Sequence, residues 1–362
     1  MEGHENGGKL EIVAIMSVPP LKVTEPRRVR KVLVSEEHRR TIEGCYQTVL
    51  YYEKLKEEEH GWSLAGWIVE SLAMVLLDYP LLAGRLQRRE VGDETELEIV
   101  SNDSGIRLLE ARFPTSLPEF LALNQKEHLE AELVFWKEID AHSPNFSPLF
   151  YVQVTNFECG GYSIGISCSV LLAEALLVEN FLEKWAQIHN KMSTKNEEIK
   201  TPIFYHPRLK TPESLPSDII TRTKSKNGVQ NMVFKITFED VNFQKELWRE
   251  LAMLCVEDAE KKLSTNMGSG FSLVVKESSD VIKVESCSKN GWSVKGLRLK
   301  HQITGTTWNH FGVYEVAFTE GNKPVHVSCW IGSVADGHVM AVPCLKENAC
   351  GGVIVVSPPP FH

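Results

Sequence analysis

The clearest periodic pattern in the chain runs through residues 63–79, SLAGWIVESLAMVLLDY. Its apolar residues recur three and four positions apart, which places them on one broad face of a helix. Ser63 is a good N-cap residue, and Pro80 lacks the N–H that a continuing helix would need. The pattern therefore predicts a helix over 63–79. The residues of its apolar face are Leu64, Trp67, Ile68, Leu72, Val75, Leu76 and Tyr79.

A second pattern alternates apolar and polar residues over 149–157 and again over 162–170. Gly160 and Gly161 stand between the two stretches, and glycines accept the positive φ angles of tight hairpin turns. Beyond residue 170 the spacing becomes helical, so we expect a buried strand that runs directly into an amphipathic helix. One face of this strand is expected to carry Tyr162, Ile164, Ile166, Cys168 and Val170, and the helix is expected to bury Leu176, Leu177, Phe181, Trp185 and Ile188.

The rest of the periodic sequence favours strands and one further helix. Residues 81–113 alternate around glycine-containing turns and predict short strands. Residues 231–263 predict a strand followed by a long helix whose buried side carries Leu247, Leu251 and Leu254. The later strand-like segments are 271–277, 280–287, 323–332 and 351–357.

The composition changes between residues 190 and 231, where Pro, Ser, Thr and charged residues replace the periodic pattern. Such a stretch is typical of a crossover or a linker between domains. A chain of 362 residues is also too long for one ordinary core. We therefore expect an N-terminal domain over 1–190, a crossover over 191–231 and a C-terminal domain over 232–362.

The net charge of −9 argues against a nucleic-acid-binding protein, because neutralising phosphates requires a basic face. Hydrophobic residues make up 43% of the chain and charged residues 24%, which is typical of a soluble globular protein. The eight cysteines include no CxxC pair and lie mostly in apolar surroundings, which favours reduced thiols in the cytoplasm. The N-terminus has no signal-peptide pattern and no apolar run is long enough to cross a membrane, so membrane contact is expected only through a partner.

Familiar motifs of catalytic and metal sites are largely missing from the sequence. His and Cys do not cluster at metal-ligand spacing, so no metal site is expected, and no complete phosphate-binding loop occurs. Residues 161–165, GYSIG, match the letters of a nucleophile elbow, but they lie at a predicted hairpin turn rather than between a strand and a helix. His128 and Glu132 stand four residues apart in a polar helical stretch, where we expect a surface pair.

Two later histidines are candidate proton acceptors. His326 lies on a predicted strand and shares a face with Ser328 and Trp330. His338 follows a turn that contains Asp336, and this close spacing suggests turn chemistry. A single histidine of either kind is more often packed and hydrogen-bonded than catalytic.

Four segments together resemble the BAHD acyltransferase superfamily of plants. The helix that ends in YPLLAGRL and the corner that ends in FLEKWA are the most specific of them, and the four occur in the family's order across much of residues 10–190. The motifs NDSGIR and FSPLFYVQVTNFECGG favour the eceriferum/Glossy-type subgroup, which is linked to very-long-chain lipid elongation in cuticular wax formation. The four segments are 76–86, 101–111, 146–167 and 181–186.

The resemblance implies an α/β fold of two chloramphenicol-acetyltransferase-like (BAHD) domains with a channel between them. In the family, a His-xxx-Asp motif at the strand-to-helix corner projects into this channel. Its His is the general base that takes the proton from an alcohol or amine attacking an acyl-CoA thioester. Its Asp turns away and pairs with an Arg, and a late Asp-Phe-Gly-Trp-Gly motif is mainly structural.

This chain departs from the family at both motifs. Counting back from FLEKWA places Val170 at the His position and Glu174 at the Asp position, and valine has no lone pair to accept a proton. The late segment FTEGNKP, residues 318–324, keeps Gly-x-Lys-Pro but neither the aspartate nor the tryptophan. The sequence after residue 232 is short for the family, so the resemblance implies a C-terminal domain that is trimmed or rearranged.

Two functional hypotheses follow. In the first, the chain is a non-catalytic protein of acyltransferase fold that serves as an accessory factor in very-long-chain acyl elongation. In the second, it is an active acyl-CoA-dependent O- or N-acyltransferase whose substitute base is Glu174, His326 or His338. A lyase or isomerase would be a third class, but no residue indicates its substrate.

The first hypothesis is preferred because both motifs are changed while the predicted scaffold is intact. It implies a fatty acid elongase condensing enzyme as the partner. It also implies acyl-CoA as ligand or substrate, no permanently bound cofactor and no metal. We expect a monomer in the cytoplasm that associates with the endoplasmic reticulum through its partner.

Overall fold

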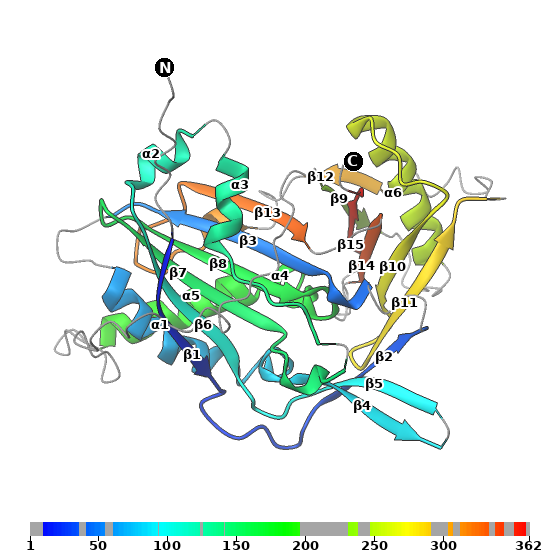
Figure 1. Cartoon of the computed structure of the whole chain (residues 1–362), viewed down its shortest axis with the longest axis horizontal. Helices are drawn as coiled ribbons and strands as arrows, with labels where there is room; N and C mark the ends of the chain where they lie inside the picture. Colours follow the sequence, from blue (N-terminus) through cyan, green and yellow to red (C-terminus); the bar gives the residue numbers. More distant parts are fainter. Residues whose placement is uncertain are drawn as a thin grey trace.

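The described residues form two β-sheets flanked by helices (Figure 1). The first sheet contains, in spatial order, β1 (Glu11–Val18), β6 (Ile106–Phe113), β7 (Phe150–Phe157), β8 (Tyr162–Ser169), β3 (Cys45–Tyr52) and β13 (His326–Gly332). The second contains β12 (Ile303–Thr306), β9 (Met232–Thr237), β15 (Gly351–Ser357), β14 (His338–Pro343), β10 (Gly270–Lys276), β11 (Val281–Ser288), β2 (Val29–Val34), β5 (Glu94–Val100) and β4 (Arg85–Val91). The computed structural model describes residues 10–35, 41–54, 61–92, 94–123, 126–140, 142–195, 231–237, 247–290, 303–306, 312–332, 337–343 and 351–359.

Helices α1 (Gly61–Val75) and α5 (Phe181–Lys195) lie side by side against one face of the first sheet (Figure 1). The hydroxyl of Ser71 on α1 accepts a hydrogen bond from Trp185 Nε1 on α5 at 2.9 Å. The opposite face carries α2 (Leu117–Leu121), α3 (Lys126–Glu130) and the short 3₁₀ helix η3 (Ala131–Leu133), which pack in a separate apolar cluster. The sheet therefore buries both of its faces.

The predicted helix over 63–79 is correct in kind but displaced at both ends. It begins at Gly61, so Ser63 lies within the helix and is not its N-cap, and it ends at Val75. Residues 76–78 form a turn, and Pro80 then begins the 3₁₀ helix η2 (Pro80–Ala83). Proline suits the first position of a helix, where its missing N–H is not needed, so Pro80 starts a new element instead of closing the old one.

The predicted hairpin is confirmed. β7 and β8 pair in antiparallel fashion, and Gly160 in the turn has a φ of +85°. The following helix is not continuous, however. Val170 begins a 3₁₀ turn, η5 (Val170–Leu172), which leads into α4 (Glu174–Leu177), and Asn180 with a φ of +56° separates α4 from α5. A left-handed residue cannot continue a right-handed helix, and asparagine adopts that conformation more easily than most residues.

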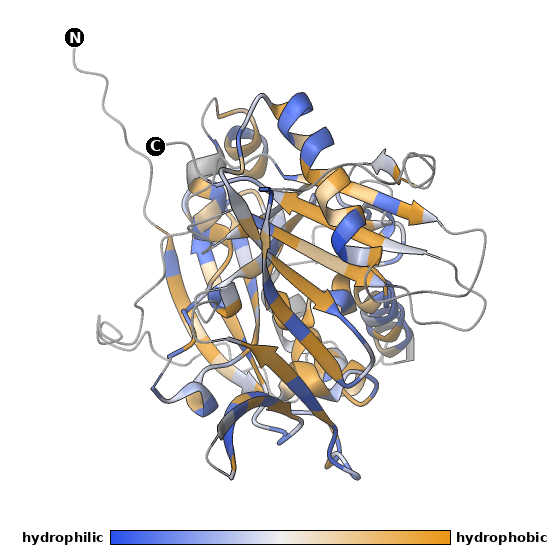
Figure 2. Ribbon diagram, turned by 90° about the vertical axis from the view of Figure 1, so that its right-hand side faces the viewer, coloured by the Kyte–Doolittle hydropathy of each residue, from blue (hydrophilic) through white to orange (hydrophobic). Residues whose placement is uncertain are grey.

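The strands predicted over 81–113 and in the C-terminal part are present as β4, β5, β6, β10, β11, β13 and β15. The predicted strand and long helix are β9 and α6 (Leu247–Leu263). Helix α6 covers the outer face of the second sheet with Leu251 fully buried. Many strands are hydrophobic over much of their length (Figure 2), whereas β4 is mostly polar. Two 3₁₀ turns, η4 (Pro144–Phe146) and η9 (Val313–Glu315), complete the described helical elements.

Each sheet contains strands from both the N-terminal and the C-terminal part of the sequence. Strands β2, β4 and β5 come from the first hundred residues but belong to the second sheet, whereas β13 joins the edge of the first sheet. One apolar cluster runs without interruption between them and includes Val152 of the first sheet and Val274 of the second. The boundaries expected at 190 and 232 flank a crossover that lies mostly outside the described residues, and they stay a prediction.

Among the described cysteines, every one is a free thiol, and Cys159 is exposed. Within the described part of the chain, no helix is both long and apolar enough to cross a membrane.

Candidate functional site

The strand-to-helix corner after β8 is held by main-chain hydrogen bonds. The N–H of Val170 donates to the carbonyl of Gly44 at 3.0 Å, and the Ser169 hydroxyl accepts from the N–H of Leu171 at 3.3 Å. The side chain of Val170 is only 2% exposed and belongs to the large apolar cluster. The side chain at the head of the corner is therefore aliphatic and cannot accept a proton.

Glu174, four residues further on, is buried in an ion-pair cluster. Its Oε1 pairs with Arg30 Nη1 on β2 and lies 3.4 Å from Lys276 Nζ on β10. Lys276 also pairs with Glu179 at 2.8 Å, so two cations face two carboxylates. Breaking a buried pair leaves an uncompensated charge, which makes such a cluster costly to disturb.

Arg30 extends the cluster to the backbone on both sides. Its Nε donates to the carbonyl of Ser279 at 3.0 Å, and its Nη1 lies 3.4 Å from the carbonyl of Leu171. Because β2 and β10 belong to the second sheet, this guanidinium and the Lys276 ammonium fasten the corner to that sheet. The Glu174 carboxylate is therefore engaged in structure and is not free to act as a base.

His326 is placed away from the corner by the strand register. It begins β13 opposite Tyr51, whereas Gly332 at the other end lies opposite Cys45, next to the end of β8. Six residues of strand separate the two ends by roughly 20 Å. His326 and the corner are therefore at opposite ends of the first sheet.

The predicted shared face of β13 is confirmed, and it lies against α3. His326 Nε2 is 3.1 Å from Lys126 Nζ and 3.2 Å from the Ser328 hydroxyl, which in turn donates to Glu130 Oε1 at 2.6 Å. Burial, and secondarily the Lys126 ammonium, lowers the pKa of His326 below its usual value. These contacts identify a packed, hydrogen-bonded histidine.

His338 occupies a different position. It begins β14 and is fully buried, and neither ring nitrogen has a hydrogen-bond partner among the described residues. Met340 and Val342 on the same side of β14 belong to the cluster that contains Val170, whereas Val339 on the other side packs with α6. His338 thus faces the first sheet. Burial lowers its pKa to about 4, so the ring is neutral at pH 7.

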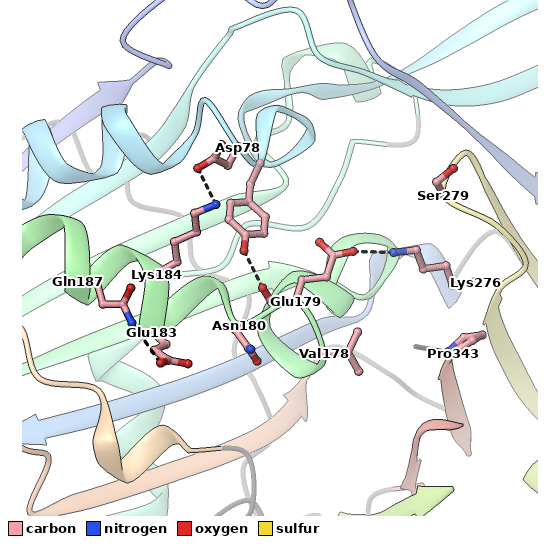
Figure 3. A pocket seen from close by; sticks show the side chains of 11 residues that line it. Asp78, Val178, Glu179, Asn180, Glu183, Lys184, Gln187, Lys276, Ser279 and Pro343 are labelled. Atoms are coloured by element: carbon pink, nitrogen blue, oxygen red, sulfur yellow. Dashed lines mark hydrogen bonds and ion pairs between the residues drawn. The ribbon is translucent and has the colours of Figure 1, made fainter. Parts of the chain in front are cut away.

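A pocket of about 700 Å³ opens beside the corner, between the α4–α5 segment and the second sheet (Figure 3). Lys184 pairs with Asp78 at 2.8 Å, and Lys276 pairs with Glu179, so both lysines of the pocket are engaged. Burial raises the pKa of Tyr79, whose hydroxyl donates to the Glu179 carbonyl at 2.6 Å, to about 12. The lining comprises Asp78, Tyr79, Val178, Glu179, Asn180, Glu183, Lys184, Gln187, Lys276, Ser279 and Pro343.

The remaining sequence candidates have structural places. Ser163 of GYSIG is buried within β8, so that motif is not a nucleophile elbow. In the late segment, Phe318 packs on Trp185 with ring centroids 4.5 Å apart, and the Asn322 amide donates to the Glu53 carbonyl at 3.0 Å. The side chain of His128, and Asp336 before His338, lie outside the described residues.

Sequence reasoning missed Arg30 and Lys276, the partners of Glu174. The resemblance implied an arginine partner without locating it, and a lysine at the end of an apolar strand gives no local signal. No group of three or more His, Cys, Asp or Glu side chains in the described part of the chain is arranged to hold a metal ion.

Comparison with known proteins agrees with the motifs. A family model described as "Transferase family" matches residues 38–288. Protein ECERIFERUM 26-like of Arabidopsis thaliana is 29% identical over 32% of this chain and 26% of its own length. Brassinosteroid-related acyltransferase 1 of the same plant is 36% identical over 36% of this chain and 28% of its own. Protein ECERIFERUM 2 is 27% identical over 36% and 32%, respectively.

The aligned region thus covers about a third or less of these relatives' length. Among solved structures, vinorine synthase aligns over 97% of this chain and 95% of its own, with 14% identity and a TM-score of 0.47. The model match extends over more than half of the chain. The predicted α/β class is confirmed, the described strands form two sheets, and the chain belongs to the Transferase family, that of the BAHD acyltransferases.

Proposed function

We propose that this chain is a BAHD-fold protein that binds an acyl ligand without transferring it and acts as an accessory factor in very-long-chain acyl elongation. The observation that carries the proposal is the corner: Val170 is packed among apolar side chains, and Glu174 is held by Arg30 and Lys276. A positioned general base contributes about 10²- to 10⁴-fold in rate, or roughly 3–5 kcal/mol of barrier. The strands and helices of the corner are present, but the side chain at the position of the general base cannot supply this rate contribution.

The ECERIFERUM relatives support the choice of pathway, and the subgroup resemblance supports a condensing enzyme of the fatty acid elongase as partner. The ligand is an acyl-CoA or the acyl chain that the condensing enzyme carries. The protein acts in the cytoplasm and is held at the endoplasmic reticulum by this partner.

The test is co-expression of the full chain with a panel of condensing enzymes, followed by profiling of acyl chain lengths. We expect a shift in the product chain lengths with at least one enzyme, and no release of free CoA by the purified chain. Glu174→Ala, which strips the carboxylate from two buried cations, should abolish the shift. Unchanged products across the whole panel would contradict the proposal.

A second candidate is acyl transfer with His338 as the proton acceptor, favoured by the orientation of its ring toward the first sheet. A base with a pKa of about 4 is weak at pH 7, which argues for slow turnover at most. Free CoA release from mixed acyl-CoAs and acceptors, lost in His338→Ala, would establish this function. CoA release that persists in His338→Ala would show that His338 is not the proton acceptor.

A further inference from the structure

Three polar residues stand side by side on the second sheet. The register places Ser272 of β10 next to His338 of β14, and His338 next to Ser357 of β15. On each strand the residue two positions along, in the direction of the sheet interior, belongs to the apolar cluster shared with the first sheet: Val274, Met340 and Val355. All three polar side chains therefore face the first sheet. We call Ser272, His338 and Ser357 the polar row.

The polar row lies close to the segment that supports the corner. The hydroxyl of Thr41 donates to that of Ser272 at 3.0 Å. The carbonyl of Thr41 accepts the N–H of Gly44, and the carbonyl of Gly44 accepts the N–H of Val170. The row and the corner are thus two sides of the same region between the sheets.

The imidazole of the row has no hydrogen-bond partner in the part of the chain that the structure describes. A neutral histidine carries one N–H donor and one nitrogen acceptor, and neither is used by a described residue. Buried polar groups in proteins are almost always hydrogen-bonded, so each exception calls for a physical explanation. A ligand that supplies the missing partner is one such explanation.

The surroundings define the chemistry of that ligand. Lys276, the charged residue on the same face of β10, lies four residues from Ser272, about 13 Å along the strand, and is paired with Glu174 and Glu179. A charged ligand group at the row would find no counter-ion among the described residues. A neutral acceptor bordered by hydrocarbon fits better, because the row offers an N–H and hydroxyl donors beside Val274 and Met340.

We propose that the polar row binds the thioester carbonyl of an acyl ligand, with His338 donating the central hydrogen bond. This assignment rests on the acyl ligand of the proposed function and adds the residues that hold it. It gives His338 a binding role that requires no proton transfer. The carbonyl oxygen accepts from the imidazole N–H, and the Ser357 hydroxyl lies beside it as a second donor.

The test compares wild type with His338→Leu in the full chain. The leucine fills a similar volume and removes an unsatisfied polar group, so the ligand-free protein should be as stable as wild type or more so. Its affinity for stearoyl-CoA and for a saturated very-long-chain acyl-CoA should fall about tenfold or more. His326→Leu, on the opposite face of the first sheet, is the matched control and should bind normally.

A second readout separates hydrogen bonding from packing. With acyl-CoA labelled with ¹³C at the carbonyl, the infrared band of the bound thioester should lie at lower frequency in wild type than in His338→Leu. Stearyl alcohol and stearate distinguish the source of the oxygen, and we expect both to bind more weakly than the thioester. Equal binding of the thioester by both proteins, with the same carbonyl frequency, overturns the proposal, as does preferential binding of stearate or of the alcohol.

Should His338→Leu fail to fold, Ser357→Ala takes its place, with a several-fold loss of affinity and a smaller band shift expected and no change in either overturning the proposal. The outcomes also separate the two levels of inference. A wild-type chain that shifts product lengths and binds acyl-CoA as tightly as the variants contradicts the row alone. A folded wild type that binds no acyl-CoA contradicts the row, and if it also leaves product lengths unchanged across the panel it contradicts the proposed function as well.

Discussion

Two buried polar sites lie between the sheets, and they differ in how completely their groups are paired. At the corner, the Glu174 carboxylate faces the cations of Arg30 and Lys276, and Glu179 completes the balance. In the polar row, the imidazole of His338 is equally buried but has no partner among the described residues. A fully paired buried cluster is costly to disturb, whereas a buried polar group without a described partner calls for a physical explanation.

The sharpest way to break this comparison is Glu174→Ala. Removing the carboxylate leaves two buried cations, with only Glu179 to balance them, and we expect a loss of about 3–5 kcal/mol in the free energy of unfolding. Urea denaturation followed by circular dichroism measures it. Lys31→Ala, which breaks an exposed pair with Glu96, is the control and should cost under about 1 kcal/mol. Similar losses of stability for the two variants would show that the ion pairs of Glu174 do not hold the corner to the second sheet.

The pH dependence of the free energy of unfolding tests the second of the two buried sites, the polar row. Burial lowers the pKa of both His338 and His189 from 6.5 to about 4. The unfolded chain takes up protons on these rings below pH 6.5, whereas the folded chain does so only near pH 4. The contribution of both rings to the free energy of unfolding is therefore complete above pH 6.5 and is lost as the pH falls toward 4. Each histidine should account for about 3 kcal/mol over that interval. In His338→Leu the loss should be smaller by about 3 kcal/mol, and an unchanged profile would show that the ring is accessible to protons in the native state.

Val170→His places a buried imidazole at the corner, similar to the one that His338 places in the polar row. Because Val170 is surrounded by apolar side chains, burying the ring without a partner should cost roughly 1–3 kcal/mol. We expect no release of free CoA from acyl-CoA by this variant. Thermal unfolding and a thiol assay measure the two effects. A stable variant that does release CoA would show that the corner still opens to a substrate.

The smallest expected effect concerns the rim of the pocket. Lys184 and Asp78 are both about half exposed, and their pair should contribute under about 1 kcal/mol. Lys184→Ala should lower the stability by that amount in dilute buffer, and the difference should vanish in high salt. A larger loss that does not depend on salt would show that this pair stabilises the fold as strongly as a buried pair does.

Local features were predictable from the sequence, and long-range contacts were not. The hairpin was predicted because Gly160 supplies the positive φ of its turn, and α6 because of its leucine spacing. The C-terminal end of α1 was missed because Pro80 begins the 3₁₀ helix η2 instead of closing α1. Arg30 was missed because 144 residues separate it from Glu174, and only the pairing of β2 with β11 brings it to the corner.

The two candidate histidines illustrate the same limit. Both begin a strand, and the local sequence gives similar reasons to consider each. Their difference arises from which sheet each strand joins and which face it presents: β13 turns His326 toward α3, whereas β14 turns His338 toward the first sheet. Sequence periodicity assigns residues to faces, but it does not say what lies opposite a face.

The exchange of strands between the sheets has a consequence for synthesis of the chain. The first sheet lacks its edge until β13 has been made, and β2, β4 and β5 have no place to dock until β11 emerges from the ribosome. The N-terminal strands must therefore wait, with apolar surface uncovered, while about two hundred further residues are translated. Neither sheet is complete until strands from both parts of the chain have been made, so the molecule should unfold in one step and should depend on chaperones while it is being synthesised.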